Sequence, residues 1–265
     1  MRVVIYANCQ GIGVKTIIPL LTRNISEDQI SNFENYKIIS GEDSYDDLIR
    51  AAAQAEVFIY QPLGASQGKF STVAGEDNVM SRVHPDARKI SFPYIYNNGL
   101  WPLYHEGTVQ NAAPIDTLFA AGANAYEIIE AYDAGEIFFN IEERVAQSLE
   151  VLAGREAETD VKVADFLRTH IRSRELMLTQ NHPTTETFIH AIDQMLTIMF
   201  EGRYARPDLD LASLGNNYAA LPGRYPIDER CVEEGGITYT HGPEEGAKIY
   251  YHNLIHLRSR ELGLS

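Results

Sequence analysis

Four residues near the N-terminus carry the strongest chemical signal: Asn8, Cys9, Gln10 and Gly11. They directly follow the apolar run of residues 3–7, which is typical of a central parallel strand that is buried on both faces. Ligands of open α/β sheets bind beyond the carboxyl ends of the strands. Cys9 is therefore a candidate nucleophile, with Asn8 and Gln10 as donors to a developing oxyanion. The alternative is a purely packing role, since free cysteine is among the most buried residue types.

A helix is expected directly after Gly11, because apolar residues recur there at helical spacing. Gly11 and Gly13 would let the backbone approach a ligand closely, and the start of the helix would direct free N–H groups at an anion. The helix dipole also predicts a lowered pKa for the Cys9 thiol. The two glycines match neither a phosphate loop nor a dinucleotide fingerprint, so nucleotide hydrolysis is not indicated.

Gln61 and His182 are the next candidates along the chain. Gln61 follows the apolar run of residues 57–60, so we expect it on the same edge of the sheet as Cys9, as a second amide donor. His182 precedes Pro183, which suits the first turn of a helix, and its imidazole could act as a general base. The plainer alternatives are strand termination at Gln61 and a capping or exposed histidine at 182. The remaining histidines show no metalloprotease spacing, so no metal site is expected.

Strands and helices alternate in the N-terminal part of the chain. Strands are predicted for residues 3–7, 36–39, 57–60 and 89–92, and a helix for residues 42–55. This alternation predicts an α/β fold with a parallel sheet of about four to five strands, in an SGNH- or flavodoxin-like layout.

The pattern changes after about residue 96. Residues 97–114 are expected to form a loop, residues 123–202 to be mostly helical, residues 204–246 to be irregular and residues 249–262 to form a closing helix. No linker separates these parts. We therefore expect one domain over residues 1–265, with an α/β core at 1–96 and a mostly helical extension at 97–265 packed on it.

Composition limits the partners of this chain. It has 265 residues and a formal net charge of −15, which argues against nucleic acid and against an anionic membrane surface as partners. The two cysteines, Cys9 and Cys231, are too few for a secreted disulfide scaffold, although a single bridge between them is an alternative to two free thiols. No signal peptide and no transmembrane stretch are predicted. A cytoplasmic location is therefore expected, with any membrane contact made through a partner.

Several of these landmarks occur together in one known family. They are Asn8-Cys9-Gln10 after the first strand, Gln61 after a later strand, Phe92-Pro93 before an aromatic stretch, and His182-Pro183 at a late helix. This set resembles the WcbI-type acetyltransferases of polysaccharide biosynthesis, over roughly residues 1–200. The resemblance implies a role in bacterial capsular polysaccharide assembly and binding of coenzyme A. The layout is also similar to that of SGNH hydrolases, with Cys9 in place of their serine, but their late Asp-x-x-His signature is absent.

The resemblance implies acyl transfer, of acetyl in particular, from coenzyme A to a sugar hydroxyl. Cys9 would attack the thioester or assist as a thiol, His182 would be the general base, and Gln10 and Gln61 would hold the oxyanion. Direct transfer without an acyl-cysteine fits the same residues. The alternatives are a glycan acyl-ester hydrolase and a non-catalytic ligand-binding module of an assembly complex. We expect contact with membrane-associated assembly machinery.

The resemblance also implies a set of residues that contact coenzyme A. They are Asn8, Gly11, Lys15, Gln61 and Arg88. Lys15 lies in the helix after Gly11, and Arg88 or, alternatively, Lys89 lies near the edge of the fourth predicted strand, so these residues would attract the phosphates of the ligand in spite of the negative net charge.

Overall fold

The structure is a computed structural model that describes residues 1–208, 210–239 and 244–264. Its contacts group the chain into two compact units. Unit 1 comprises Met1–Tyr96, Leu149–Thr169 and Leu176–Pro222, and unit 2 comprises Asn97–Ser148, His170–Glu175 and Gly223–Ser265. That the chain is a single domain, with residues 97–265 as an extension packed on residues 1–96, stays a prediction.

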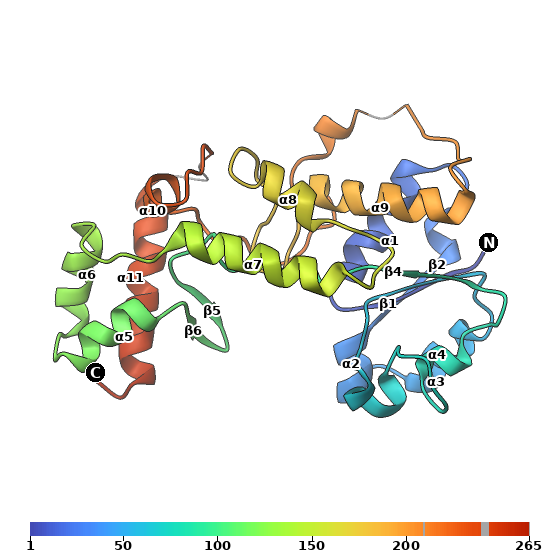
Figure 1. The fold of residues 1–265 in the computed structure, drawn as a ribbon, viewed down its shortest axis with the longest axis horizontal. Helices are drawn as coiled ribbons and strands as arrows, with labels where there is room; N and C mark the ends of the chain where they lie inside the picture. Colours follow the sequence, from blue (N-terminus) through green and yellow to red (C-terminus); the bar gives the residue numbers. More distant parts are fainter. Residues whose placement is uncertain (209, 240–243, 265) are drawn as a thin grey trace. The chain divides into compact units, whose positions relative to one another are not determined.

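Unit 1 contains a four-stranded parallel sheet with the strand order β2-β1-β3-β4 (Figure 1). The strands are β1 (Val3–Ala7), β2 (Ile30–Glu34), β3 (Val57–Tyr60) and β4 (Arg88–Ser91). The register pairs Ala7 with Glu34 and Tyr6 with Tyr60, so these strands end at the same edge of the sheet. The predicted α/β class, with a parallel sheet in the N-terminal part and many helices, is confirmed.

Helices cover both faces of this sheet. Figure 1 shows α1 (Gln10–Leu21) and α9 (Thr185–Phe200) on one face, and α2 (Asn35–Ser40), α3 (Tyr45–Ala52) and α4 (Val79–Arg82) on the other. Burial on both faces explains why β1 consists entirely of buried residues.

The contact of α1 with α9 depends on a glycine. A Cβ atom on Gly13 would lie 2.3 Å from the ring of Phe188, so only glycine fits between the two helices here. Pro19 lies inside the last turn of α1, and the helix continues past it to Leu21. The predicted helix after Gly11 is therefore confirmed, and its glycine at 13 serves packing.

The second predicted strand is wrong. Residues 36–39 lie in helix α2, with Ile38 buried and Tyr36 exposed, and α2 ends at Gly41 in the left-handed conformation at φ 81°. The strand in this part of the chain is β2, which begins six residues before the predicted one. It is an edge strand that pairs only with β1 among the described residues, and its polar Ser31 and Asn32 point to opposite faces, with Ser31 exposed and Asn32 half-buried.

Unit 2 is mostly helical and carries a short hairpin. Its strands β5 (Tyr104–Glu106) and β6 (Thr108–Gln110) are antiparallel around Gly107, which has φ 72°. This hairpin lies in the segment predicted to be a loop. The helices α5 (Ala113–Ala120), α6 (Ala125–Asp133), α10 (Glu229–Glu233) and α11 (Glu244–Glu261) lie in unit 2. Helix α7 (Ile141–Glu156) begins in unit 2 and ends in unit 1, and α8 (Ala164–His170) belongs to unit 1 except for its last residue. The predicted closing helix is α11, and it begins five residues earlier than predicted.

Aromatic side chains fill the core of unit 2. Tyr132 and Tyr251 are fully buried and pack against each other with ring centroids 5.7 Å apart. The guanidinium of Arg230 lies 3.5 Å from the centroid of the Tyr132 ring and pairs with Asp228 at 2.8 Å. Cys231 is fully buried beside this cluster, and its thiol donates to the carbonyl of Leu100 at 2.6 Å.

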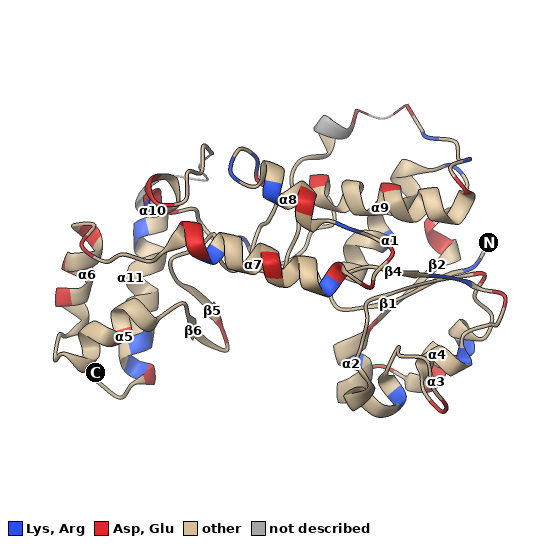
Figure 2. Cartoon of the chain, in the orientation of Figure 1, with Lys and Arg blue, Asp and Glu red and all other residues tan. Residues whose placement is uncertain are grey.

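Charge is distributed over the whole chain. Figure 2 shows acidic residues on helices of both units, α6 and α9 among them. Among the described residues, no helix is both long enough and apolar enough to cross a membrane. The described part of the chain also contains no group of three or more His, Cys, Asp or Glu side chains that could hold a metal ion.

Candidate functional site

The loops at the carboxyl edge of the sheet meet around Asn8 and Cys9. Both residues lie directly after β1 and are half-buried. The N–H of Asn8 donates to Oε1 of Gln61, which follows β3, at 2.9 Å. The predicted meeting of these two strand ends is therefore present in the structure.

Gln10 is the buried centre of this region, with no exposed surface. Its Nε2 donates to the carbonyls of Ile95 at 2.6 Å and Asn181 at 2.7 Å. Its Oε1 accepts the N–H of Ile95 at 3.2 Å and Nε2 of Gln61 at 2.9 Å. Gln61 Nε2 also donates to the carbonyl of Pro93 at 3.3 Å. The two amides thus tie together loops that are far apart in the sequence.

This network corrects the expected role of Gln10 and Gln61 as oxyanion donors. A side-chain amide has two N–H groups, and both amides donate both of theirs to protein acceptors. Neither has an N–H left for a ligand, so we assign the pair a positioning role. The donors that remain here are the backbone N–H of Cys9, which lies beside the Cys9 sulfur, and Nδ2 of Asn8, which has no acceptor among the described residues.

The pKa of Cys9 is raised, whereas the helix dipole predicted that it is lowered. Burial contributes most, and the charge of Glu34 contributes next, because both disfavour the thiolate. The backbone N–H groups of Cys9 and Gln10 lower the pKa and only partly offset these effects. Cys9 directly precedes α1 in helical conformation, at φ −52° and ψ −22°, so its sulfur is close to these N–H groups. At neutral pH the group is a thiol.

Glu34 belongs to a cluster that sequence reasoning missed. It ends β2 beside Ala7 of β1, and only 8% of it is exposed. Tyr36 donates its hydroxyl to Glu34 Oε2 at 2.5 Å, and Lys37 donates Nζ to Oε1. The sequence predicts a strand over residues 36–39, and a strand would point Tyr36 and Lys37 to opposite faces. Helix α2 instead brings both to the same carboxylate.

His182 lies in the turn before α9. Its N–H donates to Thr179 Oγ1 at 3.2 Å, and its carbonyl accepts from the N–H of Leu178 at 2.7 Å. Burial lowers the pKa of the imidazole, and a hydrogen bond to the carbonyl of Pro222 raises it by less. A neutral ring that donates to a carbonyl through one nitrogen carries its lone pair on the other. That nitrogen is Nδ1, which is buried and has no hydrogen-bond partner among the described residues.

The segments that carry Cys9 and His182 are joined directly. Gln10, the residue after Cys9, is hydrogen-bonded to the carbonyl of Asn181, the residue before His182. Further unpartnered atoms are found on the His182 segment, where Gln180 Oε1 and Thr184 Oγ1 are buried without a hydrogen-bond partner in the described part of the chain. Buried polar atoms of this kind are normally paired, so their number here is typical of a place that receives a polar ligand or water.

The comparison with protein families decides which family the chain represents. The sequence model of the polysaccharide biosynthesis enzyme WcbI matches residues 2–199, well over half of the chain. The chain belongs to the WcbI polysaccharide biosynthesis enzyme family. The resemblance inferred from the landmarks around Cys9 and His182 is confirmed at this level.

A solved structure of WcbI shares the fold. It is described as a novel polysaccharide biosynthesis enzyme, in a native form without a disulfide bond between coenzyme A and a cysteine. The two chains align with a TM-score of 0.66 at 15% sequence identity, over 98% of this chain and 90% of that chain. A comparison with curated proteins gave no match.

Three residues predicted to contact a ligand in this WcbI-family chain differ in position. Arg88 is the first residue of β4, at the opposite end of the strand, and its guanidinium binds the C-terminal carbonyls of α9 and Glu201. The expected position of Arg88 at the ligand edge is thus wrong. A Cβ atom on Gly11 would lie 2.3 Å from Asn32 Oδ1, so this glycine serves close packing on β2. Lys15 lies in α1 and has no partner among the described residues.

A cation that the sequence did not single out lies close to the loop after β4. The guanidinium of Arg155 is 5.3 Å from the ring centroid of Tyr94 and 5.5 Å from that of Tyr96. These tyrosines flank Ile95, which binds Gln10. Arg155 is exposed, so its charge is available to an anionic ligand beside this loop.

Proposed function

We propose that this WcbI-family enzyme transfers an acyl group, acetyl in particular, from coenzyme A to a sugar hydroxyl. The observation that carries the proposal is the 2.7 Å hydrogen bond from Gln10 Nε2 to the carbonyl of Asn181. It joins the segment of the half-buried thiol of Cys9 to the segment of the neutral imidazole of His182. A thiol and a base held on adjoining segments are the groups that acyl-transfer chemistry uses.

In the proposed reaction His182 is the general base. Its Nδ1 takes the proton of the acceptor hydroxyl as the oxygen attacks the thioester carbonyl. The C–S bond of the thioester then breaks, and the proton passes to the departing sulfur of coenzyme A. The N–H of Cys9 and Nδ2 of Asn8 are the donors for the oxyanion. The low pKa of His182 supports this role, because a base must be neutral before it can accept a proton.

The raised pKa of Cys9 favours direct transfer over an acyl-cysteine intermediate. The thiolate is the nucleophilic form of cysteine, and burial together with Glu34 disfavours it. In the direct route the thiol of Cys9 orients the donor instead of attacking it. The related WcbI structure is described as a form without a disulfide bond between coenzyme A and a cysteine, and this association of the two groups supports a position of Cys9 beside the donor.

The residues at this edge of the sheet fit coenzyme A, which when bound supplies the acyl thioester. The unpartnered polar atoms of the His182 segment suit its amides, and Lys15 and Arg155 suit its phosphates. Asn8 and Cys9 would face the thioester end. Gly11 and Gln61 would act only through packing and positioning, and Arg88 would make no contact.

The alternatives use the same residues. With water as the acceptor the enzyme would be a glycan acyl-ester hydrolase, and without turnover it would be a ligand-binding module. We favour transfer in the cytoplasm, with the acceptor glycan delivered by membrane-associated polysaccharide assembly machinery and with no nucleic acid involved.

Release of free coenzyme A from acetyl-CoA, with and without a glycan acceptor, tests the proposal. Release that requires the glycan supports transfer, release in water alone indicates a hydrolase, and no release with any acceptor contradicts turnover. His182→Ala should lower the turnover rate by about 100- to 10,000-fold with little change in affinity for coenzyme A. His84→Ala, which alters an exposed histidine of unit 1, is the matched control.

Cys9→Ala separates the two chemical routes. Direct transfer predicts that this variant keeps measurable turnover, whereas an obligatory acyl-cysteine predicts that turnover is lost. Mass spectrometry of the native enzyme after a brief reaction with acetyl-CoA gives an independent measurement, since an acetylated Cys9 would contradict the direct route.

A further inference from the structure

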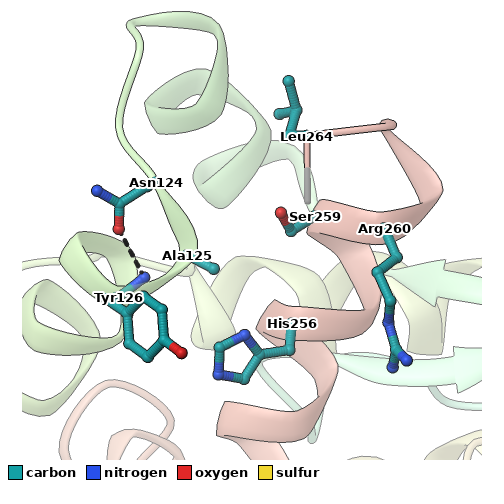
Figure 3. Close-up of a pocket in the computed structure, with 7 residues that line it drawn as sticks. All are labelled: Asn124, Ala125, Tyr126, His256, Ser259, Arg260 and Leu264. Carbon is teal, nitrogen blue, oxygen red and sulfur yellow. Dashed lines mark hydrogen bonds between the residues drawn. The ribbon is translucent and has the colours of Figure 1, made fainter.

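A hollow in unit 2 lies between the start of α6 and the second half of α11 (Figure 3). Its volume is about 430 Å³, within the range of about 300–1,000 Å³ that is usual for small-molecule sites. The side chains that matter for the argument are those of Asn124, Tyr126, His256, Ser259 and Arg260. The matched family segment ends at residue 199, so α11 contributes residues from outside it.

Arg258 and His252 of α11 each have an acidic partner. Arg258 is neutralised by Asp116 at 2.7 Å and Glu261 at 2.9 Å, and His252 is bound to Asp133 at 2.7 Å. Arg260, by contrast, lines the hollow, and its guanidinium makes no ion pair or hydrogen bond within the described residues. Figure 2 shows arginine or lysine residues, in blue, at the C-terminal end of α11. An exposed cation without a counter-ion in a chain of net charge −15 is suited to an anionic ligand.

Tyr126 supplies a flat surface at the same place. It is 73% exposed, whereas Tyr132 on the same helix is fully buried. Its ring centroid lies 5.3 Å from that of His256 with an interplanar angle of 76°, so the two rings meet edge to face. Figure 3 shows this pair at one side of the hollow. An aromatic ring with an open face suits the apolar C–H face of a sugar ring, because both are flat and gain dispersion contacts.

Hydrogen-bonding groups complete the lining. Asn124 Oδ1 accepts the N–H groups of Tyr126 and Glu127, at 2.9 and 3.2 Å. Since the oxygen is committed to the helix start, the Nδ2 donor of Asn124 remains for a ligand. Ser259 adds a hydroxyl on a side chain that is only 4% exposed. A flat ring, two polar groups and one cation together match a sugar that carries a negative charge.

We infer that this hollow binds one residue of an acidic glycan. The pyranose ring would lie on Tyr126, and its carboxylate or phosphate would bind Arg260. The inference rests on the proposed function in the choice of a glycan as ligand. It goes beyond that function by assigning the acceptor an anionic substituent and a binding site of its own in unit 2.

Calorimetry on the full chain without acyl donor tests the inference, with three probes. Trigalacturonic acid carries carboxylates, glucose 6-phosphate carries a phosphate, and maltotriose is neutral. Saturable binding of either anionic probe, and at least about tenfold weaker binding of maltotriose, supports the inference and identifies the anionic group. Absence of binding by both anionic probes at millimolar concentration overturns it. An affinity for maltotriose equal to that for the anionic probes overturns the proposed binding of a negative charge by Arg260.

Variants locate the binding to the hollow. Tyr126→Ala and Arg260→Gln should each weaken binding of the preferred probe by about tenfold, as expected for loss of one stacking or charge-assisted contact. Tyr126→Phe should stay within about twofold, since the ring is retained. Arg203→Gln removes an exposed arginine of unit 1 and should also have no effect. Unchanged binding in Tyr126→Ala would overturn the site. Because no acyl donor is used, binding can be present even where acetyl transfer fails, so the two proposals fail separately.

Discussion

Cys9 in unit 1 and Cys231 in unit 2 are both free thiols with raised pKa values, but their surroundings differ. Cys9 is half-buried at the end of a strand, among backbone N–H groups and beside the carboxylate of Glu34. Cys231 is fully buried among aromatic rings, and its thiol is bound to a carbonyl. Burial is the main cause of the raised pKa in both places.

The difference shows that the pKa direction alone does not distinguish a reactive cysteine from a structural one. The two cysteines differ in the interactions that stabilise the residues around them. The region of Cys9 depends on hydrogen bonds between side-chain amides and loop carbonyls, whereas the region of Cys231 combines packed aromatic rings with the buried ion pair of Arg230 and Asp228. A polar region of this kind is costly to alter and specifies one arrangement of the loops.

The largest expected effect comes from Gln10→Leu, which breaks the polar network around Cys9. The change leaves Gln61 Nε2, the N–H of Ile95 and two carbonyls without their partner. We expect the free energy of unfolding to fall by about 3–5 kcal/mol, as measured by urea denaturation. Gln54→Leu, at an exposed glutamine, is the control and should change it by less than about 0.5 kcal/mol. A decrease of less than about 1 kcal/mol in the free energy of unfolding of Gln10→Leu would contradict the conclusion that these hydrogen bonds stabilise the region.

The alkylation rates of Cys9 and Cys231 in the native protein provide a second comparison of the two thiols. Iodoacetamide at pH 8 should label Cys9 at least about 100-fold faster than Cys231, because Cys231 reacts only when unit 2 opens. Peptide mass spectrometry over a time course measures both rates in one sample. Similar rates for the two thiols would show that Cys231 is not held in a packed core, and the comparison would fail.

The smallest expected effect concerns the charge beside Cys9. Since Glu34 raises the pKa of Cys9, Glu34→Gln should lower it and so increase the thiolate fraction at pH 8. Labelling of Cys9 should become faster at pH 8 and converge with the native rate at high pH, where both proteins are ionised. Glu27→Gln, at an exposed carboxylate, should leave the profile unchanged. A slower rate at pH 8 for Glu34→Gln would reverse the sign of this interaction.

Much of the fold could be predicted from the sequence. Strands β1 and β3 are short apolar runs followed by polar residues, β4 contains Ile90 and is followed by Phe92 and Pro93, and α1 and α9 show clear helical spacing. The edge strand β2 could not be found, because Ser31 and Asn32 break its apolar pattern while Ile38 and Ile39 nearby mimic a strand. The hairpin around Gly107 has strands of three residues, which are too short to show periodicity.

The sequence predicts which residues come together in the candidate site better than it predicts what each of them does there. The positions of Cys9, Gln10, Gln61 and His182 follow from where strands and helices end. The positioning role of both amides could not be predicted, since three of their four acceptors are backbone carbonyls, at residues 93, 95 and 181. The lowered pKa predicted for Cys9 considered only the helix dipole, and the carboxylate of Glu34 became visible only with the register of β1 and β2.

The paired amides of Gln10 and Gln61 also give the molecule a spectroscopic reporter. All four of their side-chain protons are held between buried protein groups, so their NMR signals should be displaced from those of exposed glutamines and should exchange slowly with heavy water. Four such signals would report on whether the loops around Cys9 and His182 remain assembled while ligands, temperature or pH are varied. No label would have to be attached to the thiol itself.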